Sequence, residues 1–193
     1  MVEQEMKIPV ASLDAVRGRL AQGGGRLLHA STFEENWVLD DAQRTLAGAG
    51  RLLRVRRAGD LAWLTLKEPG SFSGGVKSRV EIETAVGSAE RTLAVLAALG
   101  FAPIRRYQKR RESWTLGRIT VALDETPIGE YVELEGPAEL LAAAAASLGL
   151  DPRDAVTATY LDLWIAYRAL HPGAPVDMVF PEPGGPGAGG TAT

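Results

Sequence analysis

Apolar and polar residues alternate with two different periods along this chain. Where every second residue is apolar, the pattern is typical of β-strands with one buried face, and Gly- or Asp-containing turns separate these runs. The alternation predicts eight strands, most of them paired as antiparallel hairpins, over residues 2–8, 26–39, 52–57, 62–68, 78–84, 105–116, 118–124 and 130–135. Hairpin turns are expected at residues 57–60, 70–75 and 116–118. Eight strands are enough to close a sheet into a barrel.

The other segments follow the helical period of about 3.6 residues. The predicted helices lie between Pro9 and Gly23 and over residues 88–99, 137–148 and 157–170. Ser88 is a candidate N-cap, and either Thr157 or Thr159 caps the last helix. Strands and helices in this order predict an α+β protein.

The chain divides into a folded domain, predicted over residues 1–180, and a tail at residues 181–193. Eight of the thirteen tail residues are Gly or Pro, which leaves too little apolar surface to offset the entropy of ordering. The tail is therefore predicted to be disordered. Just before it, Met178, Val179 and Phe180 are apolar. They either anchor the chain end against the domain or form a solvated stub.

Composition limits the chemistry that the chain can carry. It has no cysteine, which removes disulfides, thiolate nucleophiles and Cys-ligated metals together. Its two histidines, His29 and His171, lie far apart, so a multi-His zinc site is not expected. Any metal is then a hard cation held by carboxylates.

Charge and hydropathy narrow the class of protein. The 193 residues contain 21 Lys and Arg against 24 Asp and Glu, and 46% are hydrophobic, as in a soluble globular domain. The net charge of −3 and a pI near 5.5 argue against a nucleic-acid partner. No stretch approaches eighteen uncharged apolar residues, so no membrane span is expected. The acidic N-terminus is unlike a secretory signal, which favours a cytoplasmic location.

Charged residues occupy one face of the predicted strands in an ordered way. Arg54 and Arg56 share a face on either side of Val55, and Glu133 and Glu135 share a face further along. Neighbouring like charges repel unless opposite charges lie between the strands. Seven acidic and seven basic residues occupy such positions: Glu3, Glu5, Glu81, Glu83, Asp124, Glu133 and Glu135, with Lys7, Arg54, Arg56, Lys67, Arg79, Lys109 and Arg111.

Two interpretations of this pattern are open. The charged faces form the solvated outer side of an antiparallel sheet, with the alternate Val, Leu and Ile in the core. Otherwise the strands close so that the charges point inward, where carboxylates hold a divalent cation and basic groups hold an anion. A metal-bound polyphosphate satisfies both. Recurrence of the pattern in five segments of one small domain favours the second interpretation.

The charged residues fall into motifs that resemble those of the CYTH superfamily, also called triphosphate tunnel metalloenzymes. The motifs follow in family order: Glu-x-Glu-x-Lys at residues 3–7, Leu-Arg-Val-Arg at 53–56, Lys67, Arg-Val-Glu-Ile-Glu at 79–83, Tyr107 to Arg111, Leu123 to Glu125 with Gly129, and Glu-Leu-Glu-Gly at 133–136. One such motif often arises by chance, whereas the ordered set is specific. The resemblance implies an eight-stranded antiparallel barrel whose lumen grips a triphosphate and whose outer face is covered by helices.

The resemblance also implies a role for each charged residue. The ligands of one or two Mg²⁺ or Mn²⁺ ions are then Glu3, Glu5, Asp124, Glu133 and Glu135. The triphosphate clamp is formed by Lys7, Arg54, Arg56, Lys67, Arg79, Lys109 and Arg111. Glu81 and Glu83 either touch the metal or orient the basic residues. The candidate catalytic residues are Glu5, through the metal that activates water, and Lys67, as an alternative proton-transfer group.

Within this family the same lumen supports triphosphate hydrolysis, thiamine triphosphate hydrolysis and adenylate cyclisation. Leu52 stands where animal thiamine triphosphatases carry a Trp, which disfavours thiamine triphosphate. Class IV adenylyl cyclases usually have a His-Phe segment before the first motif, whereas only Met1 and Val2 precede it here. The resemblance therefore favours a metal-dependent hydrolase whose small-molecule partner is a triphosphate, with inorganic triphosphate preferred over a nucleoside or organic triphosphate.

Two alternatives remain. One is a class IV adenylyl cyclase that converts ATP to cyclic AMP and pyrophosphate. The other is a non-catalytic module that binds polyphosphate or a nucleotide. The carboxylates argue against the second alternative, because acidic residues lower the affinity for an anion unless metal is present.

Overall fold

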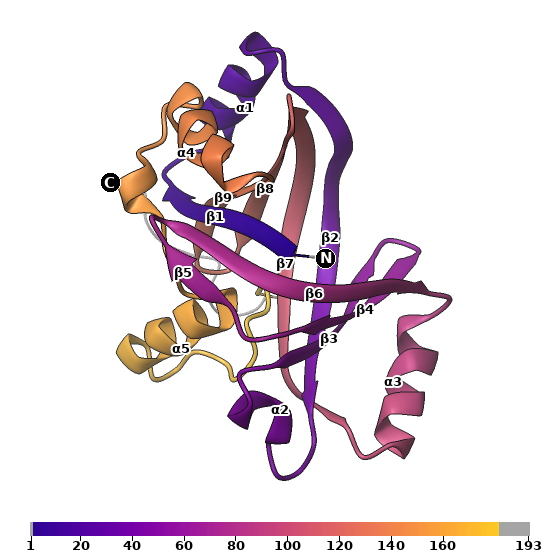
Figure 1. Cartoon of the computed structure of the whole chain (residues 1–193). Helices are drawn as coiled ribbons and strands as arrows, with labels where there is room; N and C mark the ends of the chain where they lie inside the picture. Colours follow the sequence, from indigo (N-terminus) through magenta and orange to yellow (C-terminus); the bar gives the residue numbers. More distant parts are fainter. Residues whose placement is uncertain (1, 182–193) are drawn as a thin grey trace.

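The computed structural model describes residues 2–181, which form one closed barrel with helices around it (Figure 1). The strands are β1 (Val2–Val10), β2 (Arg26–Asp40), β3 (Leu52–Ala58), β4 (Leu61–Lys67), β5 (Ser71–Ser73), β6 (Val76–Val86), β7 (Ala102–Leu116), β8 (Ile119–Thr126) and β9 (Gly129–Glu135). The helices are α1 (Leu13–Gln22), α2 (Thr45–Gly48), α3 (Ala89–Ala98), α4 (Ala138–Ser147) and α5 (Tyr160–Leu170), with a 3₁₀ turn, η1, at Pro152–Asp154.

The barrel consists of eight antiparallel strands in the order β1-β9-β8-β7-β2-β3-β4-β6, and pairing of β6 with β1 closes it. The short strand β5 lies outside this ring and pairs with β6 alone among the described strands. The predicted fold class, an eight-stranded antiparallel barrel with helices packed outside, is confirmed. β5 corrects one detail, because the segment 70–75 was expected to be a simple hairpin turn.

The apolar core lies between the barrel wall and the outer helices. On β1, Met6 and Ile8 are almost fully buried against α1 and α4, together with Leu134 of β9 and Leu141 of α4. A second cluster packs α3 against Val55 of β3 and its neighbours. Full burial of a side chain of this size contributes about 1.5–3 kcal/mol. Because the buried apolar residues of β1, β3 and β9 face the helices, the alternate residues of these strands face the lumen.

Local signals in the sequence fix two of the helix starts. The hydroxyl of Ser88 accepts a hydrogen bond from the backbone N–H of Arg91 at 3.2 Å, as expected of the N-cap of α3. Of the two candidates before α5, Thr159 is the cap, and it forms a capping box with Asp162. Helix α5 therefore begins at Tyr160, two residues later than it would with Thr157 as its N-cap.

The chain end returns to the barrel, which decides between the two possibilities left open for residues 178–180. Met178 is fully buried, and its backbone forms hydrogen bonds with Gln108 and Arg106 of β7. With Tyr160 and Trp164 of α5, Met178 forms an apolar cluster against the barrel wall. The predicted disordered tail covers residues 181–193, and all of it except Pro181 lies outside the described residues. Among residues 2–181, no helix combines the length and apolar character needed to cross a membrane.

Candidate active site

Strand register brings the charged motifs together in the lumen. Glu5 of β1 lies directly opposite Glu135 of β9 on one side and Lys77 of β6 on the other. Glu3 lies opposite Arg79. Residues directly opposite each other in a sheet project from the same face. Residues that are far apart in sequence therefore line one wall.

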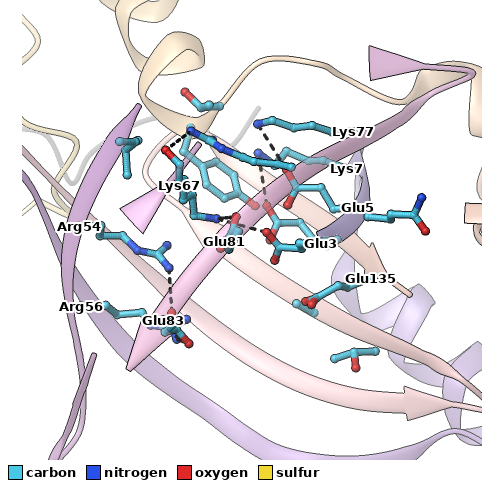
Figure 2. A pocket seen from close by; sticks show the side chains of 18 of the residues that line it. Glu3, Glu5, Lys7, Arg54, Arg56, Lys67, Lys77, Glu81, Glu83 and Glu135 are labelled. Atoms are coloured by element: carbon cyan, nitrogen blue, oxygen red, sulfur yellow. Dashed lines mark hydrogen bonds and ion pairs between the residues drawn. The ribbon is translucent and has the colours of Figure 1, made fainter. Parts of the chain in front are cut away.

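A cavity of about 940 Å³ occupies the lumen. Among the fourteen residues predicted from the charge pattern, all except Asp124 line it. The lining also includes Lys77, Tyr107 and Tyr160, which the charge pattern did not select. The tunnel thus collects side chains from β1, β3, β4, β6, β7, β9 and the start of α5 (Figure 2).

Asp124 lies behind this lining, where it is fully buried. Its carboxylate accepts hydrogen bonds from Lys109 Nζ at 2.9 Å, from Arg111 Nε at 2.7 Å and from the Tyr160 hydroxyl at 2.7 Å. Burial opposes ionisation, yet the charges of Arg111 and Lys109 lower the pKa of Asp124 below its usual value. In this arrangement Asp124 holds two cations of the clamp in place. Its predicted role as a metal ligand would require these contacts to open.

Glu133 is the second fixed carboxylate. It forms an ion pair with Lys7 at 3.3 Å and a close contact with Arg111. Burial alone would raise its pKa, but Arg111, Lys109 and Lys7 together hold the pKa of Glu133 well below its ordinary value. Lys7 is held in turn by the carbonyl of Ala158 at 3.3 Å. Glu133 is therefore an ionised group in a rigid, mostly basic surrounding.

The carboxylates nearer the β1–β6 seam are crowded. Burial, together with the hydrogen bond and negative charge of Glu81, raises the pKa of Glu3 to about 7. Partial burial and the charge of Glu3 likewise raise the pKa of Glu135. Figure 2 shows Glu3 and Glu81 at the end of Lys67, with Glu5 beside Lys77. Glu3 and Glu81 share the ammonium group of Lys67, which concentrates negative charge at this seam.

This donor set fits a divalent metal ion. Carboxylate oxygens are the preferred ligands of Mg²⁺ and Mn²⁺, and a cation among crowded carboxylates removes their repulsion. Within residues 2–181 the side chains do not form a ready-made group of three ligands, so Glu3, Glu5 and their neighbours would have to turn toward the ion.

The opposite wall carries the basic groups. Arg54 donates hydrogen bonds to the Tyr107 hydroxyl at 3.2 Å and to Thr65 at 3.3 Å. Arg56 forms an ion pair with Glu83 at 3.3 Å and lies over the ring of Trp63. Burial and the charge of Arg54 lower the pKa of Arg56. Two guanidinium groups side by side, one buried and one half-buried, are a strong site for a multiply charged anion.

Sequence reasoning missed two further polar residues of the lumen face, Glu34 and Asn36 of β2. Glu34 lies 3.8 Å from Lys109 and 3.7 Å from Arg56, and both Glu34 and Asn36 are buried. Alternation of charged and uncharged residues is the sequence signal that would indicate Glu34. The signal was hidden because Glu35, the next residue, faces the opposite side of the wall and pairs with Arg57 at 2.7 Å.

The closed barrel and its lumen define the class of this protein. It is a tunnel protein whose inner wall carries clustered cations and carboxylates, suited to binding a polyanion. The CYTH domain family matches residues 1–154, and the chain belongs to this family. The resemblance indicated by the motifs is thereby confirmed. CYTH proteins are generally enzymes of triphosphatase or cyclase type that depend on a divalent metal.

Individual relatives carry names of both kinds. A protein of Methanocaldococcus jannaschii with the provisional name adenylate cyclase is 25% identical over 136 residues, which are 70% of this chain and 77% of the relative. The solved structure of a Vibrio parahaemolyticus protein with the same provisional name has a TM-score of 0.77 at 21% identity, over 86% of this chain and 98% of that one. A Hippeastrum protein, provisionally named adenylyl cyclase and described as having a dominant triphosphatase activity, has a TM-score of 0.66 at 18% identity, over 86% and 96%. At these identities the solved structures show a shared fold.

Proposed function

We propose that this protein hydrolyses a triphosphate with the help of a divalent metal ion, and that inorganic triphosphate is its preferred substrate. The observation that carries the proposal is the lining of the lumen. Eight basic side chains line the cavity: Lys7, Arg54, Arg56, Lys67, Lys77, Arg79, Lys109 and Arg111. Among the described lining residues the only aromatic side chains are Tyr107 and Tyr160, and the hydroxyls of both are bonded to charged residues. Binding energy therefore comes chiefly from the phosphate chain.

The basic residues of the lumen bind and position the phosphate chain. Arg54, Arg56 and Arg111 hold the phosphate oxygens by charge-assisted hydrogen bonds and spread the developing charge. Holding the chain at several points fixes the terminal phosphorus relative to the attacking water. Asp124 contributes by keeping Lys109 and Arg111 in position.

The acidic residues of the lumen provide the ligands for the metal ion. Glu3, Glu5, Glu133 and Glu135 are the residues that would hold Mg²⁺ or Mn²⁺, and Glu81 and Glu83 orient basic residues from the neighbouring strand. The metal, when bound, neutralises phosphate charge and activates water for attack. Lys67 contacts Glu3 and Glu81, which places an ammonium group between the two walls as a candidate for proton transfer.

The experiment is a product analysis with three substrates. Inorganic triphosphate, ATP and thiamine triphosphate are each incubated with Mg²⁺ or Mn²⁺, and phosphate, pyrophosphate and cyclic AMP are measured. We expect phosphate release, fastest from inorganic triphosphate, and no release in excess chelator. Cyclic AMP and pyrophosphate from ATP, with inorganic triphosphate left intact, would establish the cyclase alternative instead.

The cyclase is kept as the second candidate because the Methanocaldococcus jannaschii relative bears that name. A third outcome is binding without turnover of any substrate under either metal. That result would favour the non-catalytic binding module.

A further inference from the structure

Asn36 is a buried amide without a hydrogen bond. It lies in the C-terminal half of β2 with 0% of its surface exposed, and neither Oδ1 nor Nδ2 has a hydrogen-bond partner in the described part of the chain. Its register neighbours are Arg56 on β3 and Tyr107 on β7, and both line the cavity. Asn36 therefore projects to the lumen side and lies beneath these two side chains.

Unpaired donors lie on the same wall. The Nε atoms of Arg54 and Arg56 are also buried without a partner. The terminal nitrogens of Arg56 are held by Glu83 and Glu34, at 3.3 and 3.7 Å. The wall thus holds an amide acceptor without a donor beside a guanidinium donor without an acceptor.

One further atom on this wall has no hydrogen bond. Oε2 of Glu34, two residues before Asn36 on the same face, has only the Lys109 ammonium group as an ion-pair partner, at 3.8 Å. Leaving buried polar atoms unpaired lowers stability, and an apolar residue of the same shape would avoid that cost. An asparagine here is explained if its hydrogen bonds form in another state of the site.

We propose that Asn36 is a positioning residue for the phosphate clamp, an inference that rests on the proposed function. When a triphosphate enters, the guanidinium of Arg56 turns from Glu83 toward the anion. Asn36 Oδ1 then accepts a hydrogen bond from Arg56 Nε, and Asn36 Nδ2 donates one to Glu34 Oε2. The plane of the guanidinium is thereby fixed, with both terminal nitrogens facing phosphate oxygens.

The test compares stability with affinity in the isosteric variant Asn36→Leu. Because the amide has no partner in the free protein, we expect the melting temperature to stay unchanged or rise by about 2–4 °C. Calorimetric titration with inorganic triphosphate should show a Kd about tenfold higher, and KM should rise more than kcat falls. A lower melting temperature with unchanged triphosphate affinity would show that Asn36 is purely structural and overturn the inference.

A second background tests whether Asn36 acts through Arg56. Lysine has no Nε–H in a planar fork, so in Arg56→Lys the substitution Asn36→Leu should cause no further loss of affinity. An equal further loss would overturn the inference.

The wild-type protein separates the inference from the proposed function. If it binds triphosphate but releases no phosphate, the proposed function fails and the comparison of Asn36 variants still holds. If it binds no triphosphate, both fail. If it binds and hydrolyses triphosphate and Asn36→Leu behaves like the wild type, the inference alone fails.

Discussion

Asp124 is the fully buried carboxylate that pairs with two basic residues of the lumen. Three neighbouring side chains, Lys109, Arg111 and Tyr160, donate hydrogen bonds to its carboxylate, and no part of it is exposed. Removing one partner of such a group leaves the others buried without compensation, which costs far more than the loss of a surface ion pair.

We expect Asp124→Asn to lower the free energy of unfolding by about 3–5 kcal/mol, because Lys109 and Arg111 lose their counter-charge. Urea denaturation at neutral pH measures this change. Glu125→Gln on the same strand is the matched control, because Glu125 pairs with Arg110 on the exposed side of the barrel. Its loss should stay below about 1 kcal/mol. An equal loss of unfolding free energy in the two variants would contradict the role of Asp124 as the buried counter-charge of Lys109 and Arg111.

The two lumen-facing arginines of β3, Arg54 and Arg56, should act on every substrate alike. We expect Arg54→Ala and Arg56→Ala each to reduce kcat/KM for inorganic triphosphate and for ATP by comparable factors, about 100-fold or more, because both touch the phosphate chain that the substrates share. Arg57→Ala is the control on the same strand, since Arg57 faces outward and pairs with Glu35 and Glu90. A loss confined to ATP would place the arginines at a nucleoside site.

At the scale of the elements, the sequence predicted those strands and helices that carry their own periodicity. Helix α2 was missed because it spans about one turn, too short for a period to show. Its first N–H groups are satisfied by Asp40, whose carboxylate accepts from Leu46 at 3.0 Å and from Ala47 at 2.9 Å. That contact comes from the preceding strand and depends on how the chain turns.

The candidate site was likewise predictable only where residues show a clear periodicity along a strand. Alternation along a strand identifies residues that share a face, so Arg54 and Arg56 could be grouped from the sequence alone. Glu34 and Asn36 could not, because charge at two consecutive positions leaves the phase of β2 open. Their placement follows from pairing with Lys109 and Arg56 on neighbouring strands.

The chain end contributes to stability through one side chain. We expect Met178→Ala to lower the free energy of unfolding by about 2–5 kcal/mol, since Met178 is fully buried between α5 and the barrel. Thermal unfolding measures the change. Val179→Ala, next to it and only partly buried, is the control and should have a smaller effect. An unchanged melting temperature in Met178→Ala would mean that residues 177–180 are not needed for the apolar cluster against the barrel wall.

At the scale of the whole molecule, the barrel wall separates an apolar exterior layer from a charged interior. The apolar layer under the helices stabilises the wall, which leaves the lumen free to carry uncompensated charge. Repulsion within the acidic wall, as between Glu5 and Glu135 at directly opposite positions, is then relieved by a bound cation.

We expect Mg²⁺ or Mn²⁺ to raise the melting temperature of the wild type by about 5–10 °C at a hundredfold excess over Kd, because the ion binds only the folded barrel. Glu135→Gln should keep the metal-free stability and lose most of this shift together with turnover. Glu139→Gln, exposed on the outer helix α4, should keep both. A full metal shift in Glu135→Gln would remove Glu135 from the ligand set.

Closure of the barrel through β1 has a consequence for the order of assembly. Glu5 finds its partners at Lys77 and Glu135, and the second of these lies 130 residues further along the chain. During synthesis the first strand can pair with β6 once that strand has been made, but the barrel closes only when β9 pairs with the other edge of β1, and contacts over such long loops form late and slowly. Glu5 and Glu135 meet only at that closing step. A partly folded chain that has not closed through β9 lacks the complete set of proposed metal ligands, so we expect metal binding to depend on barrel closure.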